Sequence, residues 1–232
     1  DSFLVASSYQ QAYHPVTSSP QHISAFSMQK LISIILLFFS ISVHPAQHFI
    51  TPRMSQEELH EVISGVKPSD TITFKNGNYK DKNWVLELSG TESNRIHLRG
   101  ESYGGVVFTG ASALTLRGAY ITLSRVIFQE GSTPKKDVIR FDKGSHHLRL
   151  TESAIIDYNP AKESRENKWV SLYGHHHQVD HNYFSGKSNV GALLVIWRED
   201  TTENFHQIER NYFSRPALVD HNNEGECIRI GT

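Results

Sequence analysis

The sequence of 232 residues contains a single cysteine, Cys227, and carries almost no net charge. One thiol cannot build an internal disulfide framework or a zinc site made of several cysteines. The 23 Lys and Arg residues nearly balance the 24 Asp and Glu residues, which excludes a protein held to nucleic acid chiefly by its bulk charge. A mean hydropathy of -0.41 excludes a membrane protein with many spans. The hydrophobic content of 38% is nevertheless enough for a globular core.

The first 46 residues have only two charged side chains, Asp1 and Lys30. An apolar run over residues 31–41 follows Lys30, and a short polar stretch then leads to Ala46. This layout predicts a signal peptide over residues 28–46, because the run is too short to span a bilayer comfortably. A buried core helix is the alternative. Export, to the periplasm or out of the cell, agrees with a fold that needs no disulfide.

Residues 1–27 precede Met28, are rich in Ser, Gln, Tyr and His, and show no hydrophobic period. We interpret them as a leader of upstream translation and expect them to be disordered. A pro-segment is the less favoured alternative, because it would place the signal inside the chain. The folded domain is expected over residues 47–232, with no stable membrane insertion after the signal is removed.

One short helix is expected near the start of this domain. Ser55 and Glu58 have the spacing of a capping box, apolar residues follow at helical intervals, and Gly65 and Pro68 mark the end. The predicted helix spans about residues 55–65. After it, short alternating segments separated by turns indicate β-strands, and no second good helix pattern appears.

An internal repeat is the most informative feature of the domain. Four segments align on apolar anchors that are 27, 29 and 29 residues apart, namely Leu123, Leu150, Val179 and Ile208, and Leu98 marks an earlier copy. Each unit is interpreted as a strand, a tight bend and a second strand. A repeat of this length without helices predicts a β-solenoid whose first coil is capped by the helix. Asn182 and Asn211 share one register position, so we expect them to stack as a ladder at the bend.

Several strings within the repeat resemble polysaccharide lyase family six, the family of alginate lyases and chondroitinase B. The resemblance runs from about Ser55 to the last residue and is carried by residues 168–174, 179–184, 186–197, 211–216 and 223–232. It implies an all-β fold, a right-handed parallel β-helix, in an exported protein. It also implies calcium-assisted β-elimination of an anionic polysaccharide built of uronic acids.

In such an elimination, a proton leaves the carbon next to a carboxylate, and that proton is weakly acidic while the carboxylate keeps its charge. The resemblance implies that calcium neutralises the carboxylate, a Lys takes the C5 proton and an Arg assists the leaving oxygen. It assigns a calcium ligand to Asn223, although Glu224 stands where the family has Gly. Two Glu ligands, the Lys and the Arg are expected beyond Thr232, so we expect a truncated chain with little or no activity of its own.

Four basic residues are the predicted substrate-binding residues, because cationic side chains can offset the carboxylates of a polyanion: Lys168, Lys187, Arg198 and Arg229. The family strings favour this role for Lys168 and Arg229. For Lys187 and Arg198, solvated surface charge is an equal alternative.

Other conspicuous side chains are interpreted as structural. Trp169 and Trp197 border apolar strand segments and are expected to pack rather than to bind sugars. Histidines 175–177 and His181 lack a spaced third metal ligand, so we expect strand and loop histidines. Cys227 is expected to be a small core residue.

Two functions of different classes stay open at the level of sequence. The favoured one is an exported lyase that acts on alginate, with dermatan sulfate as the alternative substrate. The other is a solenoid that binds glycans or coats a surface without catalysis. A Glu-x-Glu pair followed by Lys on a further coil would distinguish them.

Overall fold

The computed structural model describes residues 45–133, 136–160, 166–198, 201, 203–214 and 226–231. The chain divides into Asp1–Val43 and His44–Thr232, and every described residue belongs to the second unit. The predicted leader, most of the predicted signal peptide and Asn223 therefore lie outside the described residues. Within the described ranges, no helix is both long enough and apolar enough to cross a membrane.

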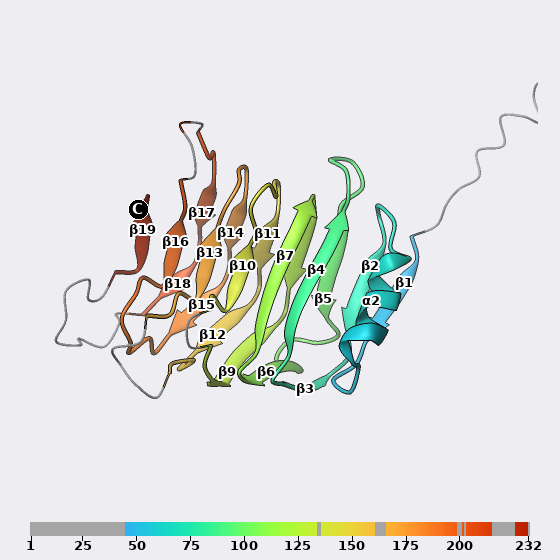
Figure 1. The fold of residues 1–232 in the computed structure, drawn as a ribbon, viewed down its shortest axis with the longest axis horizontal. Helices are drawn as coiled ribbons and strands as arrows, with labels where there is room; N and C mark the ends of the chain where they lie inside the picture. Colours follow the sequence, from blue (N-terminus) through green and yellow to red (C-terminus); the bar gives the residue numbers. More distant parts are fainter. Residues whose placement is uncertain are drawn as a thin grey trace, which may run out of the picture. The chain divides into compact units, whose positions relative to one another are not determined.

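The described unit is a parallel β-helix whose strands form three sheets (Figure 1). The first sheet has the order β1-β2-β5-β8-β11-β14-β17, with the bounds Gln47–Ile50, Thr71–Phe74, Ile96–Gly100, Ile121–Ser124, Arg149–Thr151, Gln178–Asp180 and Gln207–Glu209. The second has the order β3-β6-β9-β12-β15-β18, with the bounds Gly77–Lys80, Val106–Gly110, Ile127–Gly131, Ala154–Ile156, Tyr183–Ser185 and Tyr212–Phe213. The third has the order β4-β7-β10-β13-β16-β19, with the bounds Asn83–Ser89, Ala113–Ala119, Ile139–Phe141, Val170–Leu172, Leu194–Ile196 and Ile228–Ile230.

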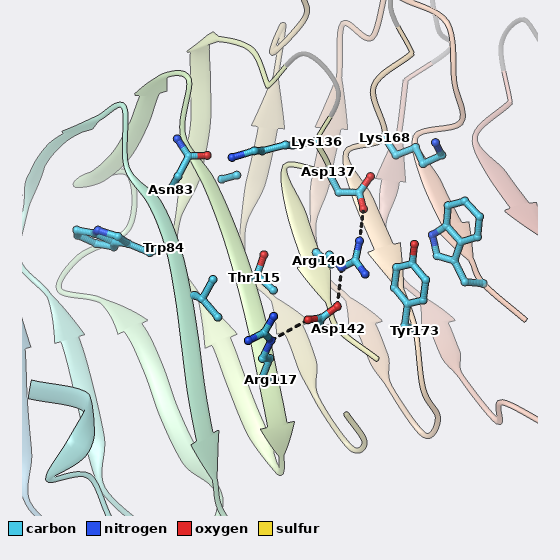
Figure 2. A pocket seen from close by; sticks show the side chains of 13 residues that line it. Asn83, Trp84, Thr115, Arg117, Lys136, Asp137, Arg140, Asp142, Lys168 and Tyr173 are labelled. Atoms are coloured by element: carbon cyan, nitrogen blue, oxygen red, sulfur yellow. Dashed lines mark hydrogen bonds and ion pairs between the residues drawn. The ribbon is translucent and has the colours of Figure 1, made fainter. Parts of the chain in front are cut away.

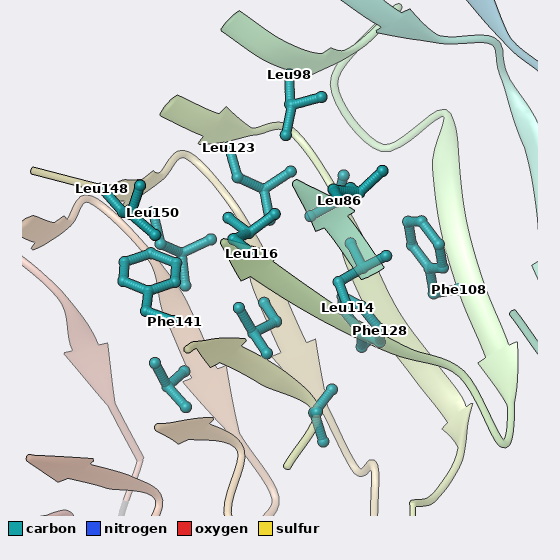
Figure 3. Packing of buried hydrophobic residues seen from close by; sticks show 14 of the residues in the cluster. Leu86, Leu98, Phe108, Leu114, Leu116, Leu123, Phe128, Phe141, Leu148 and Leu150 are labelled. Carbon is teal, nitrogen blue, oxygen red and sulfur yellow. The ribbon is translucent and has the colours of Figure 1, made fainter. Parts of the chain in front are cut away.

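The predicted repeat is confirmed at the level of individual partners. Leu98 pairs in register with Leu123, Leu123 with Leu150, Leu150 with Val179, and Val179 with Ile208. The three leucines are fully buried, and aromatic rings continue the core beside them, with Phe108 and Phe128 stacked at 4.8 Å (Figure 3). Each coil has a third strand in addition to the two that the sequence predicted.

In the coils that begin with β8, β11, β14 and β17, the bend between the first and second sheets is a two-residue corner. Its first residue has a positive φ in Arg125, Glu152, His181 and Arg210. The next position forms the expected ladder: the Asn182 side chain accepts the Ser153 N–H at 3.0 Å, and the Asn211 side chain accepts the Asn182 N–H at 3.0 Å. Amide side chains thus satisfy backbone groups that the sharp corner would otherwise leave unpaired.

The predicted helix is α2, Gln56–Ser64, and it lies at the N-terminal end of the solenoid (Figure 1). Both halves of the capping box are present, since Ser55 accepts the Glu58 N–H and Glu58 accepts the Ser55 N–H. Leu59 and Ile63 are the buried residues of the helix, which contacts β1 and β4. The helix therefore covers apolar groups of the first coil, as expected of a cap.

The histidines form stacked columns at the corner between the third and first sheets. The rings of His147 and His176 stack at 4.7 Å, and those of His146 and His175 at 5.4 Å. In the described part of the chain, no group of three or more His, Cys, Asp or Glu side chains is arranged to hold a metal ion. The stacked rings lie in the connections between strands, which is the placement expected of loop histidines.

Candidate polysaccharide-binding groove

The third sheet presents a regular row of side chains on its outer face. Register pairs Val85 with Thr115, Thr115 with Arg140, and Arg140 with Ser171. The row continues through Val195 to Arg229. Because parallel strands keep corresponding residues on one face, side chains that are far apart in the sequence line up on this face, although Ser171 and Val195 in the row are buried.

A groove of about 540 Å³ lies on this surface (Figure 2). Its walls combine four cationic side chains, two carboxylates and several aromatic or polar groups. The lining residues are Asn83, Trp84, Val85, Ala113, Thr115, Arg117, Lys136, Asp137, Arg140, Asp142, Lys168, Tyr173 and Trp197. Basic and aromatic side chains along an open groove suit an acidic polysaccharide, whose sugars carry both carboxylates and apolar ring faces.

A chain of ion pairs crosses the floor of the groove, as the dashed lines of Figure 2 show. Asp142 receives hydrogen bonds from the Nε of Arg117 at 2.8 Å and from the Nε of Arg140 at 2.7 Å. Burial opposes ionisation of Asp142, but these two hydrogen bonds outweigh it and lower the pKa of the carboxyl. Asp142 is therefore a fixed negative charge between two arginines.

Asp137 is the second carboxylate of the floor, and its side chain is only 14% exposed. Burial raises its pKa, although a hydrogen bond from Ser171 and the nearby charges of Lys168 and Arg140 act in the opposite direction. The Arg140 Nη1 lies 3.8 Å from the carboxylate. The Ser171 Oγ also accepts a hydrogen bond from the Trp197 Nε1 at 3.2 Å, so a polar chain runs from the floor to the wall.

The aromatic wall consists of Tyr173 and Trp197, whose rings stack at 5.2 Å with an interplanar angle of 6°. The Arg140 guanidinium lies 4.2 Å from the centre of the Tyr173 ring, and the Lys168 Nζ lies 5.3 Å from that of Trp197. Lys168 also pairs with Glu166 at 2.8 Å. These contacts hold the two cations in defined positions beside the wall.

Three of the four predicted substrate-binding residues lie on or beside this sheet. Lys168 lines the groove. Arg229 occupies the row of Arg140 on β19 and pairs with Glu226 at 2.6 Å. Arg198 is exposed and directly follows Trp197.

The fourth, Lys187, does not line the groove. Its side chain is buried, with 2% exposure, and its ammonium donates to the Asn167 carbonyl and to both the carbonyl and the side-chain oxygen of Asn189. Burial lowers the pKa of Lys187 to about 7. Lys187 therefore links two loops, and its side chain is not accessible to a polymer.

Two interpretations of other residues need correction. Trp169 is fully buried as expected, but Trp197 forms part of the groove wall and is not simply a packing residue. Cys227 is only half-buried. Trp197 lies just outside β16, where the alternation of buried and exposed positions no longer holds, whereas Cys227 precedes β19, the outermost strand of the third sheet.

Arg117, Arg140, Asp137 and Asp142 were missed in the sequence, because the third strand of each coil was not recognised. A signal was present, since Arg140 lies between buried Ile139 and Phe141, the alternation of a strand with one outer face. The loops that lead into these strands differ in length, so the period is hidden.

Comparisons with known proteins agree with this fold. The family model described as Chondroitinase B matches residues 54–232. No curated protein matches the chain. Among solved structures, the PL6 family alginate lyase AlyGC has a TM-score of 0.74 and 32% identity, over 81% of this chain and 26% of that one.

Two further solved structures are similar. A mannuronic acid specific polysaccharide family 6 lyase from human gut microbiota has a TM-score of 0.74 and 26% identity, over 80% of this chain and 44% of that one. A PL6 alginate lyase in complex with a trisaccharide has a TM-score of 0.61 and 23% identity, over 80% and 42%, and shows the fold alone. The chain thus spans between a quarter and somewhat less than half of the length of these structures. The family match and the coil-by-coil register together show that the chain belongs to polysaccharide lyase family six, the chondroitinase B family.

Proposed function

We propose that this chain contributes the groove of an exported lyase that cleaves uronic-acid polysaccharide, with alginate as the substrate, by β-elimination. The observation that carries the proposal is the groove itself, in which four cations and a stacked aromatic pair lie along one sheet. The titles of the similar structures, which name alginate lyases and a mannuronic acid specific lyase, support the choice of substrate. Export rests on the apolar run that precedes the domain.

In the proposed reaction, a base removes the proton from C5 of a uronate. The electron pair of that C–H bond forms the C4–C5 double bond, the C4–O bond breaks, and the leaving oxygen takes up a proton. In this reaction, the role of the described residues is to bind and orient the polymer. Lys168 and Arg140 would hold its carboxylates, while the wall of Tyr173 and Trp197 would limit how the sugar rings can lie.

Calcium belongs to the proposal only through the resemblance. Asn223 and the expected glutamates lie outside the described residues, and the described part of the chain has no group of three ligands. When bound, calcium would neutralise the substrate carboxylate.

Binding is tested by titration calorimetry of the chain with alginate oligosaccharides and with a neutral glucan at low salt. We expect binding to alginate only. Lys168→Met should weaken it about fivefold, since one charge contact that solvent can reach contributes up to about 1 kcal/mol. The matched control is Lys80→Met, because Lys80 is exposed on β3 of another sheet. Equal binding of both polymers, or equal effects of both variants, would show that the groove is not the binding site for alginate.

Elimination is tested on this chain and on any longer product of the same gene. The ultraviolet absorbance of the unsaturated product is followed with alginate and with dermatan sulfate, before and after addition of a calcium chelator. We expect absorbance from the longer product on alginate, and its loss with the chelator. Binding without elimination by a folded longer product would instead support the non-catalytic glycan-binding solenoid.

A further inference from the structure

The groove contains more negative charge than a site for a polyanion needs. Its lining has four cationic side chains, Arg117, Lys136, Arg140 and Lys168, and two carboxylates. Both carboxylates lie on the floor, where a bound polymer would rest. A groove that only had to attract negative charge would gain nothing from them, because like charges repel at short range.

Asp142 already occupies the two arginines of the floor. Its oxygens lie 2.8 Å from the Arg117 Nε and 2.7 Å from the Arg140 Nε, while the Nη1 of Arg117, 4.0 Å from Glu87, and the Nη1 of Arg140, 3.8 Å from Asp137, make only long ion pairs and can still donate to a ligand. A polymer with one carboxylate per sugar can use those nitrogens. A polymer with additional sulfates needs further cationic partners, and Asp142 already pairs with two of the four cations of the groove.

Asp137 has a different effect: the charges of Arg140 and Lys168 lie near it, but its ion pair with Arg140 is a long one. Ser171 donates to it and itself accepts a hydrogen bond from the Trp197 indole. Its nearest guanidinium nitrogen, the Arg140 Nη1, is at 3.8 Å, beyond hydrogen-bond distance. A sulfate placed here would face an anion, whereas a sugar hydroxyl could donate a hydrogen bond to it.

We propose that Asp137 and Asp142 are specificity-determining residues that make the groove accept polysaccharides with one carboxylate per sugar and reject sulfated ones. This inference rests on the proposed function, because it assumes that the groove binds an acidic polysaccharide. It goes further by separating two substrate classes, unsulfated uronans and sulfated glycosaminoglycans, and by naming the side chains that separate them.

The experiment compares the affinities of the chain for alginate oligosaccharides and for dermatan sulfate oligosaccharides of equal length at fixed ionic strength. For the wild type we expect alginate to bind at least tenfold more tightly. Asp137→Asn keeps the shape and the hydrogen bond from Ser171 but removes the charge, and should reduce this ratio about tenfold. Asp142→Asn should increase both affinities, that for dermatan sulfate more strongly.

The matched control is Glu61→Gln, which removes one negative charge on α2, outside the groove. It should leave the ratio unchanged. Circular dichroism and thermal unfolding establish that each variant is folded, and Asp137→Ser serves as a second neutral variant if Asp137→Asn does not fold. If the wild type binds alginate and a folded neutral variant keeps the wild-type ratio, the selectivity inference is wrong while the proposed function stands. If the wild type binds neither polymer, the proposed function itself is wrong.

Discussion

The hydroxyl of Tyr158 offers a one-atom test of how the solenoid is held together. The ring is fully buried, and the oxygen accepts the Ser112 N–H at 2.8 Å while its proton faces the carbonyls of Gly110 at 2.6 Å and Ser112 at 2.9 Å. Tyr158→Phe keeps the ring and its edge-to-face contact with Phe128. It leaves the two Ser112 backbone groups without the partner they have in this fold.

The magnitude follows from these orphaned groups. An unsatisfied buried donor or acceptor costs about 1–3 kcal/mol, and Gly110 retains a second partner in the Ser132 N–H. Removing a buried hydroxyl also relieves the cost of its own desolvation. We therefore expect Tyr158→Phe to lower the free energy of unfolding by about 2–3 kcal/mol, with almost no change of core volume.

Urea unfolding followed by circular dichroism and by tryptophan fluorescence measures this loss, and coincidence of the two signals tests whether the coils unfold together. The control is Tyr183→Phe, since Tyr183 is 45% exposed on the neighbouring coil. It should change the free energy by less than about 0.5 kcal/mol. Equal losses for the two variants would refute the hydrogen-bond reasoning.

Three further predictions concern single residues. Asn182→Ala should lower the free energy of urea unfolding by about 2–4 kcal/mol, because it removes buried hydrogen bonds to two coils. Asn211→Ala, at the half-buried end of the ladder, should lower it less. Equal losses for the two variants would argue against the ladder. Burial, with the nearby His175 and His176, lowers the pKa of His206 to about 4, so the folded chain binds its proton less tightly than the unfolded chain. Stability should therefore fall as the pH drops from about 6.5 to about 4, and less steeply in His206→Gln; an unchanged slope would contradict this. Ser55→Ala should cost about 1 kcal/mol through loss of the helix cap, while Ser55→Asp should cost little.

Much of the fold follows from one short-range rule in the sequence. The corner between the first and second sheets has two residues in each coil from β8 to β18, so the anchors Leu123, Leu150 and Val179 recur at nearly constant spacing. Constant spacing makes the repeat visible, and the repeat predicts the stacking. The helix could be predicted equally well, because the capping box of Ser55 and Glu58 is a local sequence pattern.

The candidate site was harder to predict from the sequence, because it depends on the strand register across loops of unequal length. Nothing near Arg140 in the sequence indicates that it will lie between Thr115 and Ser171. Lys187 was difficult to predict for another reason: it is a loop residue whose side chain is buried. A lysine in a loop is usually solvated, and only the folded chain reveals the carbonyl groups that surround its ammonium.

The unequal loops have a consequence for how such a protein can diverge. Residues 132–138, 157–169 and 186–193 connect the second sheet to the third at one corner, and they lead directly into the strands that carry the groove. The corner between the first and second sheets, with its asparagine ladder, joins neighbouring coils and is separate from these loops. Mutation can therefore change the exposed positions of the loops, and with them the border of the groove, provided that buried loop residues such as Tyr158 and Trp169 are kept. A library of variants aimed at a new polysaccharide should be diversified at this corner and leave the ladder untouched.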